Sequence, residues 1–370
     1  MQEKTYKMNK IIYLDAAASA LKPASVIDAQ TTFLRDAYAN AGRGICARAM
    51  AADKMVSDVR QCVADFMGAA PHQIVFTSGA TDGLNRIVRI VGASRETRVG
   101  VSALDHHSAR LPWMATGAEI IECTLSANFD IDVRQIPNVD VLVITAMSNV
   151  LGQPQDVNAI VRAARQKNPN VITVVDAAQY VVHDNIKVQK WDADFVCWSA
   201  HKIGADTGLG IMYIKNPTHF SPDKFGGGMV NRVFPDGAFS LQPSPDCWEA
   251  GTLPLTQIAG LRPAIECLTQ SRPDVRLIKY MYNALSKNPR IKILTTPDAA
   301  MLSFVIDDMH VLDFGALVGA RGLCLRVGNM CASWIHRALG VPGSARISVG
   351  SYNTMDDAHT AVDIINSVVK

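Results

Sequence analysis

The sequence lacks a Cys-X-X-Cys pair, and its eight cysteines are spread irregularly over 370 residues. A chain of this length can bury a sizeable core without covalent staples, so disulfide frameworks and structural zinc sites are both disfavoured. We expect a reducing compartment. Five of the cysteines lie among apolar neighbours, where we expect small buried hydrophobic residues: Cys62, Cys123, Cys197, Cys267 and Cys324. Cys331 lies in a polar segment between arginines and is the exception.

The sequence also lacks a long basic run, an acidic tail, internal repeats and any apolar run long enough to span a bilayer. Its net charge of +2 is the balance of 36 basic and 34 acidic residues. This balance disfavours nucleic acids and membrane surfaces as partners and favours a small-molecule substrate. Residues 1–10 are polar without an apolar core, which argues against a secretory signal. We therefore expect a soluble, cytoplasmic protein.

Strand patterns and helix patterns alternate along the chain. Apolar runs typical of buried strands occupy 74–77, 99–103, 119–125, 139–146, 171–175 and 194–198, and helical apolar spacing occupies 26–39, 47–67, 82–91 and 156–167. This alternation predicts an α/β fold with a large, mostly parallel sheet covered by helices.

A second, smaller α/β layer is predicted towards the carboxyl end. Strand patterns lie near 291–294, 303–306, 323–327 and 345–349, with helices near 311–320 and 356–368. We expect an N-terminal segment over 1–15, a large domain over 16–254 and a small domain over 255–370. A helix over 255–268 is predicted to lead from one domain to the other.

Polar residues follow several of the predicted strands, where ligands bind in sheets of this kind. The residues at such positions are Thr81, His106, Asn149, Asp176 and Lys202. Each one alone has an ordinary explanation, such as a helix cap without a ligand, a solvated histidine pair or a surface lysine. Their coincidence at one kind of position favours a shared site.

The types of residue at these positions suit one cofactor. The turn Ser78–Thr81 leads into a helix, whose free N–H groups and hydroxyls can bind an anion. A strand-end lysine and a strand-end aspartate near such an anion site suit pyridoxal 5′-phosphate. The lysine would form the Schiff base, and the carboxylate of Asp176 would keep the pyridine nitrogen protonated.

Short motifs extend this pattern nearly from end to end: 13–17 with 21–23, 76–81, 106–107 with 112–113, 147–150, 176–179, 199–202 with 207–208, 226–228, 249–252, 326–332, and Arg346 with 352–354. With them the sequence resembles the fold-type I, class V aminotransferase family, and within it the group II cysteine desulfurases and selenocysteine lyases. The lysine and aspartate motifs are specific to the superfamily. The segment around Cys331 selects the desulfurases.

The resemblance implies roles for the residues of the cofactor site. Lys202 matches the Schiff-base lysine and proton shuttle, His106 the residue that stacks on the ring, and Asp176 the partner of the pyridine nitrogen. The other implied cofactor ligands are Gln179 and Asn149 near the phenolic oxygen or the substrate, and Ala80, Thr81, Ser199, His201 and Thr252 at the phosphate. Thr252 would come from a neighbouring subunit, which implies a homodimer with shared sites.

The resemblance also implies a substrate and a product. Arg346 matches the clamp for the carboxylate of L-cysteine, and Arg326, with Arg43 from the partner chain, would line the approach. Cys331 would attack the substrate sulfur, leaving alanine and a persulfide for an acceptor protein, in sulfur mobilisation such as iron–sulfur cluster assembly. The short span around Cys331 leaves no room for a long mobile loop, which indicates group II.

Three segments depart from the family pattern. Asn329-Met330 stands where histidine usually precedes the cysteine, Cys46 replaces another common histidine, and Ile203–Asp206 replaces an aromatic-glycine-proline segment. Two alternatives to desulfuration therefore stay open. One is another reaction of the same cofactor without Cys331, such as C–S or selenocysteine lysis, epimerisation or transamination, and the other is a non-catalytic binding partner.

Overall fold

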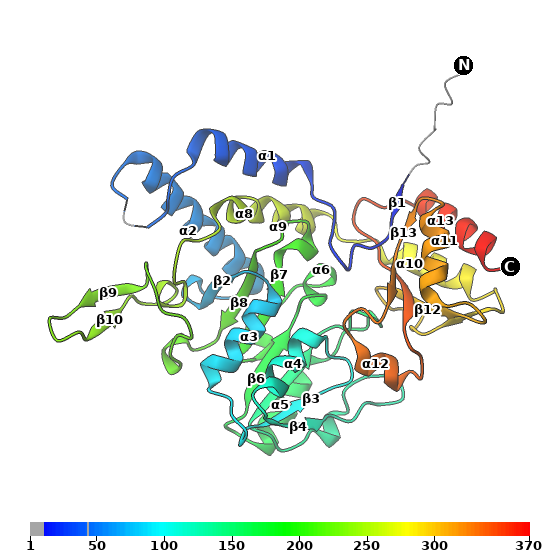
Figure 1. The fold of residues 1–370 in the computed structure, drawn as a ribbon, viewed down its shortest axis with the longest axis horizontal. Helices are drawn as coiled ribbons and strands as arrows, with labels where there is room; N and C mark the ends of the chain where they lie inside the picture. Colours follow the sequence, from blue (N-terminus) through cyan, green and yellow to red (C-terminus); the bar gives the residue numbers. More distant parts are fainter. Residues whose placement is uncertain (1–10, 43) are drawn as a thin grey trace. The chain divides into compact units, whose positions relative to one another are not determined.

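The computed structural model of the protein describes residues 11–42 and 44–370 (Figure 1). Arg43, one of the predicted substrate residues, lies outside the described residues. The chain divides into two compact units. The larger unit comprises Ser19–Ser148 and Pro154–Ser271, and the smaller one comprises the described part of Met1–Ala18 together with Asn149–Gln153 and Arg272–Lys370. The predicted domain boundaries after residues 15 and 254 stay predictions.

A seven-stranded sheet forms the centre of the larger unit. Its spatial order is β2 (Ile74–Thr77), β8 (Gly210–Ile214), β7 (Phe195–Ser199), β6 (Ile172–Asp176), β5 (Val141–Thr145), β3 (Arg98–Val101) and β4 (Glu119–Glu122). Only the pairs that involve β8 are antiparallel. Strands β5, β7 and β8 are buried along their whole length, as expected for a sheet with both faces covered. The predicted α/β fold with a large, mostly parallel sheet is confirmed.

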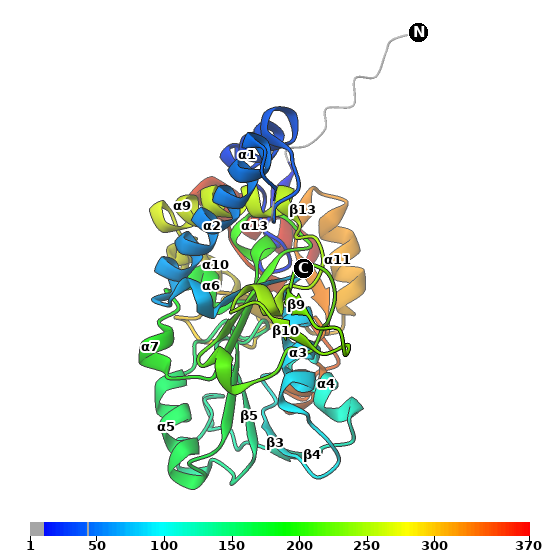
Figure 2. The same ribbon diagram turned by 90° about the vertical axis from the view of Figure 1, so that its left-hand side faces the viewer.

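Helices cover both faces of this sheet. Figure 2 shows α3 (Ala80–Val91) and α4 (His107–Ala115) on one face, with α5 (Val157–Lys167) and α7 (Val188–Trp191) on the other. The short α6 (Tyr180–His183) follows β6. Asp156 caps α5 by accepting a hydrogen bond from the Ala159 N–H at 3.0 Å. Apolar side chains from strands and helices meet in one core, which includes Leu84, Trp113 and Phe195.

The long helix α2 (Ala47–Met67) follows the predicted bounds. Its buried residues Ala49, Ala52, Val56, Val59, Val63 and Met67 repeat every three or four positions, which places them on one face. The helix ends at Gly68, whose φ of 68° is in the left-handed region that glycine adopts readily. Helix α1 (Ala24–Thr32) precedes α2 and passes into a π-helical turn, Phe33–Ala37.

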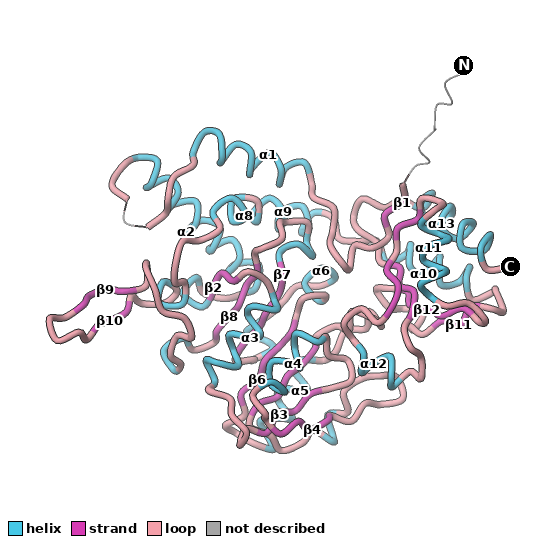
Figure 3. Tube along the Cα trace, viewed as in Figure 1, coloured by secondary structure: helices cyan, strands magenta, loops and turns pink. Residues whose placement is uncertain are grey.

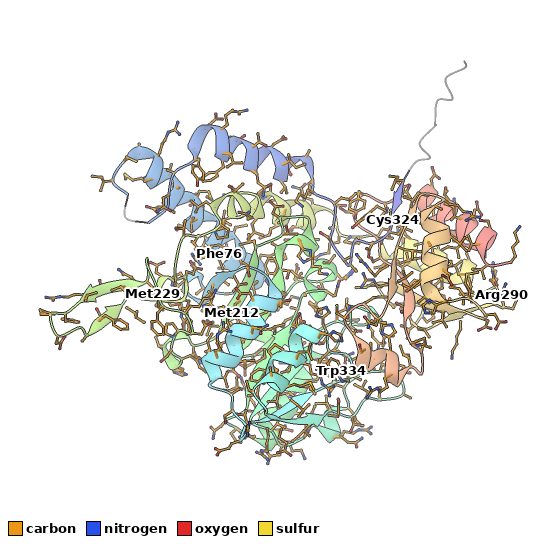
Figure 4. The ribbon with its side chains drawn as sticks, in the orientation of Figure 1. Phe76, Met212, Met229, Arg290, Cys324 and Trp334 are labelled. Atoms are coloured by element: carbon orange, nitrogen blue, oxygen red, sulfur yellow. The ribbon has the colours of Figure 1, made fainter. Side chains whose placement is uncertain are left out.

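One predicted helix proved to be two. Helices α8 (Leu255–Ala259) and α9 (Leu261–Gln270) meet at Gly260, and both belong to the larger unit. A Cβ atom at Gly260 would lie 2.9 Å from the Gln30 side-chain nitrogen, so glycine lets α1 approach closely. An antiparallel hairpin, β9 (Val230–Val233) and β10 (Phe239–Leu241), was not predicted. It extends away from the sheet in Figure 1, with Met229 labelled at its base in Figure 4.

The smaller unit contains a four-stranded antiparallel sheet in the order β11 (Ile291–Ile293), β12 (Leu302–Ile306), β15 (Ser344–Ile347) and β14 (Arg326–Gly328). Figure 3 shows the accompanying helices α10 (Val275–Leu285), α11 (Val311–Gly319) and α13 (Met355–Val368), and α12 (Ser333–Ala338) follows β14. Beside this sheet, β1 (Ile12–Tyr13) pairs in parallel with β13 (Leu323–Cys324). The predicted smaller α/β layer is thus confirmed.

All eight cysteines are free. Cys123 and Cys197 are buried as predicted, whereas Cys62, Cys267 and Cys324 are only half-buried. Cys46 and Cys331 are exposed. Within residues 11–42 and 44–370, no helix combines the length and the apolar character needed to cross a bilayer.

Candidate active site

The predicted lysine lies where the sequence places it, directly after β7. The chain leaves this strand in one 3₁₀ turn, Ala200–Ile203, that ends at Gly204 with a φ of 86°. The Ala20 N–H donates to the His201 carbonyl at 3.1 Å, and a Cβ atom at Gly204 would lie 3.0 Å from Pro23. Residues 20–23 therefore pack directly against the turn that carries Lys202.

A cavity of about 410 Å³ opens beside this turn, at the start of α3. Its lining residues are Ser78, Gly79, Thr81, Asp82, Asn85, Ser199, His201, Thr207 and Gly208. The Nδ1 atom of His201 is buried and has no hydrogen-bond partner among the described residues. Burial, together with the positive charges of Lys202 and Lys22, lowers the pKa of His201 to about 4. The neutral ring therefore offers a hydrogen bond to a ligand in the cavity.

The sheet register brings the two sides of this cavity together. Gly210 of β8 pairs with Thr77 on one side and with Ser199 on the other. A Cβ atom at Gly210 would lie 2.5 Å from the Gly79 Cα, so only glycine allows this approach. The Ala80 N–H donates to the Ser199 hydroxyl at 2.8 Å, and the Thr81 hydroxyl contacts the Ser108 hydroxyl at 2.8 Å.

The charge balance of the cavity includes one acidic group. Asp82 accepts a hydrogen bond from the Ser78 N–H at 3.0 Å and has Lys224 at 3.9 Å. Both contacts offset its negative charge. The start of α3 and the surrounding hydroxyls stay favourable for an anion, because helix N-termini carry a partial positive charge.

Asp176 is the last residue of β6 and is buried. Burial raises the pKa of its carboxyl, while the hydrogen bond from the Ala178 N–H at 3.0 Å and the positive charge of Lys202 act in the opposite direction. A buried carboxylate of this kind is stabilised by a cationic partner. Gln179, three residues further on, is buried as well.

His106 follows β3 and caps α4. Its Nδ1 atom accepts a hydrogen bond from the Ser108 N–H at 3.1 Å, so the ring proton of the neutral form lies on Nε2. This bond fixes the orientation of the ring.

The smaller unit holds a second polar cluster. Arg346 of β15 is buried, and its guanidinium lies 3.1 Å from one carboxylate oxygen of Asp15, while Arg326 of β14 lies 2.6 Å from the other. Arg346 also donates to the Asn149 carbonyl at 2.7 Å. Burial lowers the pKa of Arg346 to about 10, which leaves it charged at neutral pH. Its Nε atom is buried without a partner among the described residues, so the cluster can still donate to an anionic ligand.

Cys331 belongs to this same unit and is exposed on the turn between β14 and α12. Trp334, labelled in Figure 4, follows it on α12. Met330 and Cys331 both have left-handed backbone conformations, with φ angles of 51° and 54°. The Asn149 side chain donates to the Met330 carbonyl at 2.8 Å.

The structure thus sorts the predicted site residues into two groups. The larger unit holds Ala80, Thr81, His106, Asp176, Gln179, Ser199, His201, Lys202 and Thr252, and the smaller unit holds Asn149, Arg326, Cys331 and Arg346. Thr252 is exposed and follows Glu249, which the buried Arg60 holds with two hydrogen bonds of 2.7 and 2.8 Å. Asn149, which the sequence places just after a strand of the large sheet, groups with the smaller unit, and its predicted role stays a prediction.

Sequence reasoning missed two residues of these clusters. Asp15 forms ion pairs with both Arg326 and Arg346. The signal that could have revealed it was an acidic residue directly after a short apolar run. Gly210 is required between the two sides of the cavity, but its role depends on strand register, which the sequence does not display.

The larger cluster fits pyridoxal 5′-phosphate chemically. The hydroxyls, the helix start and the unpartnered His201 nitrogen suit a phosphate, and the buried Asp176 suits a protonated ring nitrogen. Lys202 is close enough to Asp176 to influence its pKa.

Comparison with known proteins yields a consistent set of relatives. The profile of the family described as Aminotransferase class-V, whose members depend on pyridoxal phosphate, matches residues 12–360. A probable cysteine desulfurase of Vibrio cholerae is 32% identical, and the match covers 98% of this chain and 94% of the relative. A cysteine desulfurase of Pectobacterium atrosepticum is 31% identical, with coverages of 94% and 90%.

Two solved structures have the same fold. The apo cysteine desulfurase of Thermococcus onnurineus superposes with a TM-score of 0.91 at 27% identity, covering 97% of this chain and 94% of the other. The cysteine desulfurase CsdA of Escherichia coli, in an S-sulfonic acid form, superposes with a TM-score of 0.87 at 30% identity, with coverages of 96% and 94%.

Proposed function

The chain belongs to the class-V aminotransferase family, and on that premise we propose that it is a pyridoxal 5′-phosphate-dependent cysteine desulfurase. It converts L-cysteine to L-alanine and retains the sulfur as a persulfide on Cys331. The observation that carries the proposal is an exposed thiol on a left-handed turn, in the unit that also holds the buried cation Arg346.

The larger unit supplies the groups that hold the cofactor. We propose that Thr81, Ser199 and His201 bind the phosphate, that Asp176 pairs with the ring nitrogen and that His106 lies on the ring. When bound, the cofactor withdraws electrons from the substrate and so weakens the bonds at its Cα and Cβ atoms. Lys202 holds the cofactor in the resting enzyme and moves the proton at the substrate Cα.

The smaller unit supplies the groups that handle the substrate and its sulfur. Arg346 binds the substrate carboxylate, and Arg326 supports the same negative charge. The Cys331 thiolate attacks the substrate sulfur, the S–S bond forms and the C–S bond breaks. Lys202 returns to Cα the proton that it removed, and the proton released by the Cys331 thiol completes the methyl group at Cβ. L-cysteine and the Cys331 thiol thus become L-alanine and a persulfide.

We further propose a homodimer and a protein acceptor for the sulfur. The larger unit exposes apolar side chains at Ile45, Met50, Val233 and Phe239, which supports burial against a second copy. Thr252 and Arg43 of one copy then serve the site of the other. The exposed position of Cys331 suits transfer to another protein. A cytoplasmic location stays a prediction.

The decisive experiment incubates the purified protein with L-cysteine and analyses Cys331 by mass spectrometry. We expect one added sulfur atom on Cys331 and an equivalent of L-alanine. Cys331→Ala should release no sulfide in the presence of reductant, whereas Cys46→Ala, which removes the other exposed cysteine, serves as the control. Full sulfide release by Cys331→Ala would refute the proposal.

A second candidate is a reaction of the same cofactor that does not use Cys331, such as C–S lysis, selenocysteine lysis, epimerisation or transamination. The observation in its favour is the turn itself, because Asn329 and Met330 supply no proton-transferring side chain. Product analysis across a panel of amino acids separates this candidate from desulfuration. Alanine formation without sulfur on Cys331 would favour it.

A further inference from the structure

Two successive residues in the turn before α12 adopt the left-handed backbone conformation, although neither is glycine. Side chains with a Cβ atom disfavour this conformation, so the surrounding structure has to hold it. Gly328, just before the turn, has a φ of 102°, and Ala332, just after it, is buried. Met330 and Cys331, the proposed nucleophile, are thus the two residues of this turn with a Cβ atom that adopt the left-handed conformation.

Two asparagines hold this pair from opposite ends. The Asn329 side-chain oxygen accepts a hydrogen bond from the Cys331 N–H at 3.2 Å, and its carbonyl accepts one from the Ala332 N–H at 2.9 Å. From the other end, the Asn149 side-chain amide donates to the Met330 carbonyl at 2.8 Å. The peptide group between Met330 and Cys331 is thus bonded through both its carbonyl and its N–H.

Asn149 also links the turn to the buried cation. Its main-chain carbonyl accepts the Arg346 hydrogen bond at 2.7 Å, and the residue as a whole is buried, with an exposed fraction of 8%. The bond to the Met330 carbonyl fixes the amide so that the nitrogen faces the turn. The other end, Oδ1, is buried and has no partner among the described residues, which leaves an acceptor for a ligand donor.

We propose that Asn149 and Asn329 are positioning residues for Cys331, which hold the thiol in its left-handed turn and connect that turn to Arg346. The inference deepens the proposed function, because positioning matters only if Cys331 reacts. Asn329 thereby has a role that needs no proton transfer: it binds the main chain of the nucleophile. Position 330, directly before Cys331, then needs only a side chain that tolerates the left-handed conformation.

The test uses two isomeric substitutions in the full-length holoenzyme. Isoleucine and leucine contain the same atoms, but the β-branch of isoleucine disfavours the left-handed conformation much more strongly. In Met330→Ile we expect amide exchange at Cys331 and Ala332 to rise about tenfold and kcat for alanine formation to fall about tenfold, because the turn opens. KM should stay within about twofold, because the Arg346 cluster is untouched. Met330→Leu should match the parent in all three measurements.

A second variant tests the contact itself. Asn149→Asp keeps the shape of the side chain and the main-chain bond to Arg346, but replaces the donor with an oxygen that repels the Met330 carbonyl. We expect faster exchange in the same turn and unchanged exchange in the strands of both sheets, measured by rapid-quench hydrogen exchange and mass spectrometry.

The exchange measurement needs no substrate, so it is independent of the proposed function. Parent-like exchange in both Met330→Ile and Asn149→Asp would overturn the positioning role. Faster exchange with parent-like kcat in Met330→Ile would also overturn it, since the turn would then not matter for the reaction. Absence of alanine from the parent protein would refute the proposed function while the exchange data still decide whether the turn is held.

Discussion

Among single residues, two buried carboxylates at the ends of β6 and β3, which flank β5 in the large sheet, have different surroundings. Asp176 ends β6 and has Lys202 nearby, which stabilises its charge. Asp105 follows β3, is fully buried and accepts hydrogen bonds from the Ser102 N–H at 2.8 Å and the Thr145 hydroxyl at 2.7 Å. It thus ties the end of β3 to the end of β5, directly before His106.

The surroundings of Asp105 predict a pH-dependent stability. Burial raises its pKa to about 7, although the bonds from Ser102 and Thr145 and the charge of Arg110 act against this rise. In the unfolded chain the pKa returns to about 4. Between these pH values the folded state keeps a proton that the unfolded state has lost, so this group contributes less stability as the pH rises from about 4 to about 7.

We expect Asp105→Asn to remove this dependence. The asparagine oxygen can accept from the Ser102 N–H, and its amide can donate to the Thr145 hydroxyl, which can rotate to accept. The melting temperature of Asp105→Asn minus that of the parent should become more positive by about 2 °C or more between pH 5 and pH 8. Calorimetry across this range measures the difference.

The control for this prediction is Asp156→Asn, which exchanges one good helix N-cap for another at α5. The melting temperature of Asp156→Asn minus that of the parent should vary little between pH 5 and pH 8. If the difference in melting temperature between Asp105→Asn and the parent does not change with pH, Asp105 keeps the same protonation state when the chain unfolds. Cys123, whose pKa is raised to about 12 by burial and by neighbouring Asp105 and Glu122, stays protonated throughout this range.

At the scale of elements, the anion cavity depends on how closely the start of α3 approaches β8. We expect Gly210→Ala to push the 78–81 turn away, because the new methyl group would lie 2.5 Å from the Gly79 Cα and 2.6 Å from its carbonyl carbon. The Ala80 bond to Ser199 would break. Unfolding free energy should fall by about 1–3 kcal/mol, and pyridoxal phosphate affinity should fall with it.

Gly319→Ala on α11 provides the matched control, because no heavy atom lies within 4 Å of its added Cβ. Chemical denaturation and cofactor titration should give parent-like values for this variant. Parent-like cofactor affinity in Gly210→Ala would show that the close approach of the two segments is not needed for binding.

Elements with strong local signals could be predicted from the sequence, and those set by distant contacts could not. Helix α2 has a regular apolar face and a terminal glycine, so its bounds were predicted correctly. The break at Gly260 depends on its contact with Gln30, far away in the chain. The same holds for the candidate site, where the motif residues were predicted but Asp15 was not, since its partner Arg346 lies 331 positions away.

At the scale of the whole molecule, several large apolar side chains of the larger unit are exposed. On the larger unit, Ile45 is 97% exposed and Val233 is 66% exposed, and they belong to the α2 start and the β9–β10 hairpin. Burying such side chains against a second copy would remove apolar surface from water. The proposed dimer would cover them and would bring Thr252 of each copy to the site of the other.

If each site uses residues from both chains, two inactive variants should regain activity when they are mixed, whereas a dimer with separate sites should not. A Lys202→Ala chain lacks the lysine, and an Arg43→Ala/Thr252→Ala chain lacks the residues donated to its partner, so each homodimer should be nearly inactive. In a mixed dimer, the intact lysine of the second chain meets the intact Arg43 and Thr252 of the first, which restores one site of two. Random exchange makes half of the dimers mixed, so about a quarter of the parent activity should return. Light scattering should give a dimer mass for every sample. If activity does not return after subunit exchange between such dimers, each chain completes its own site.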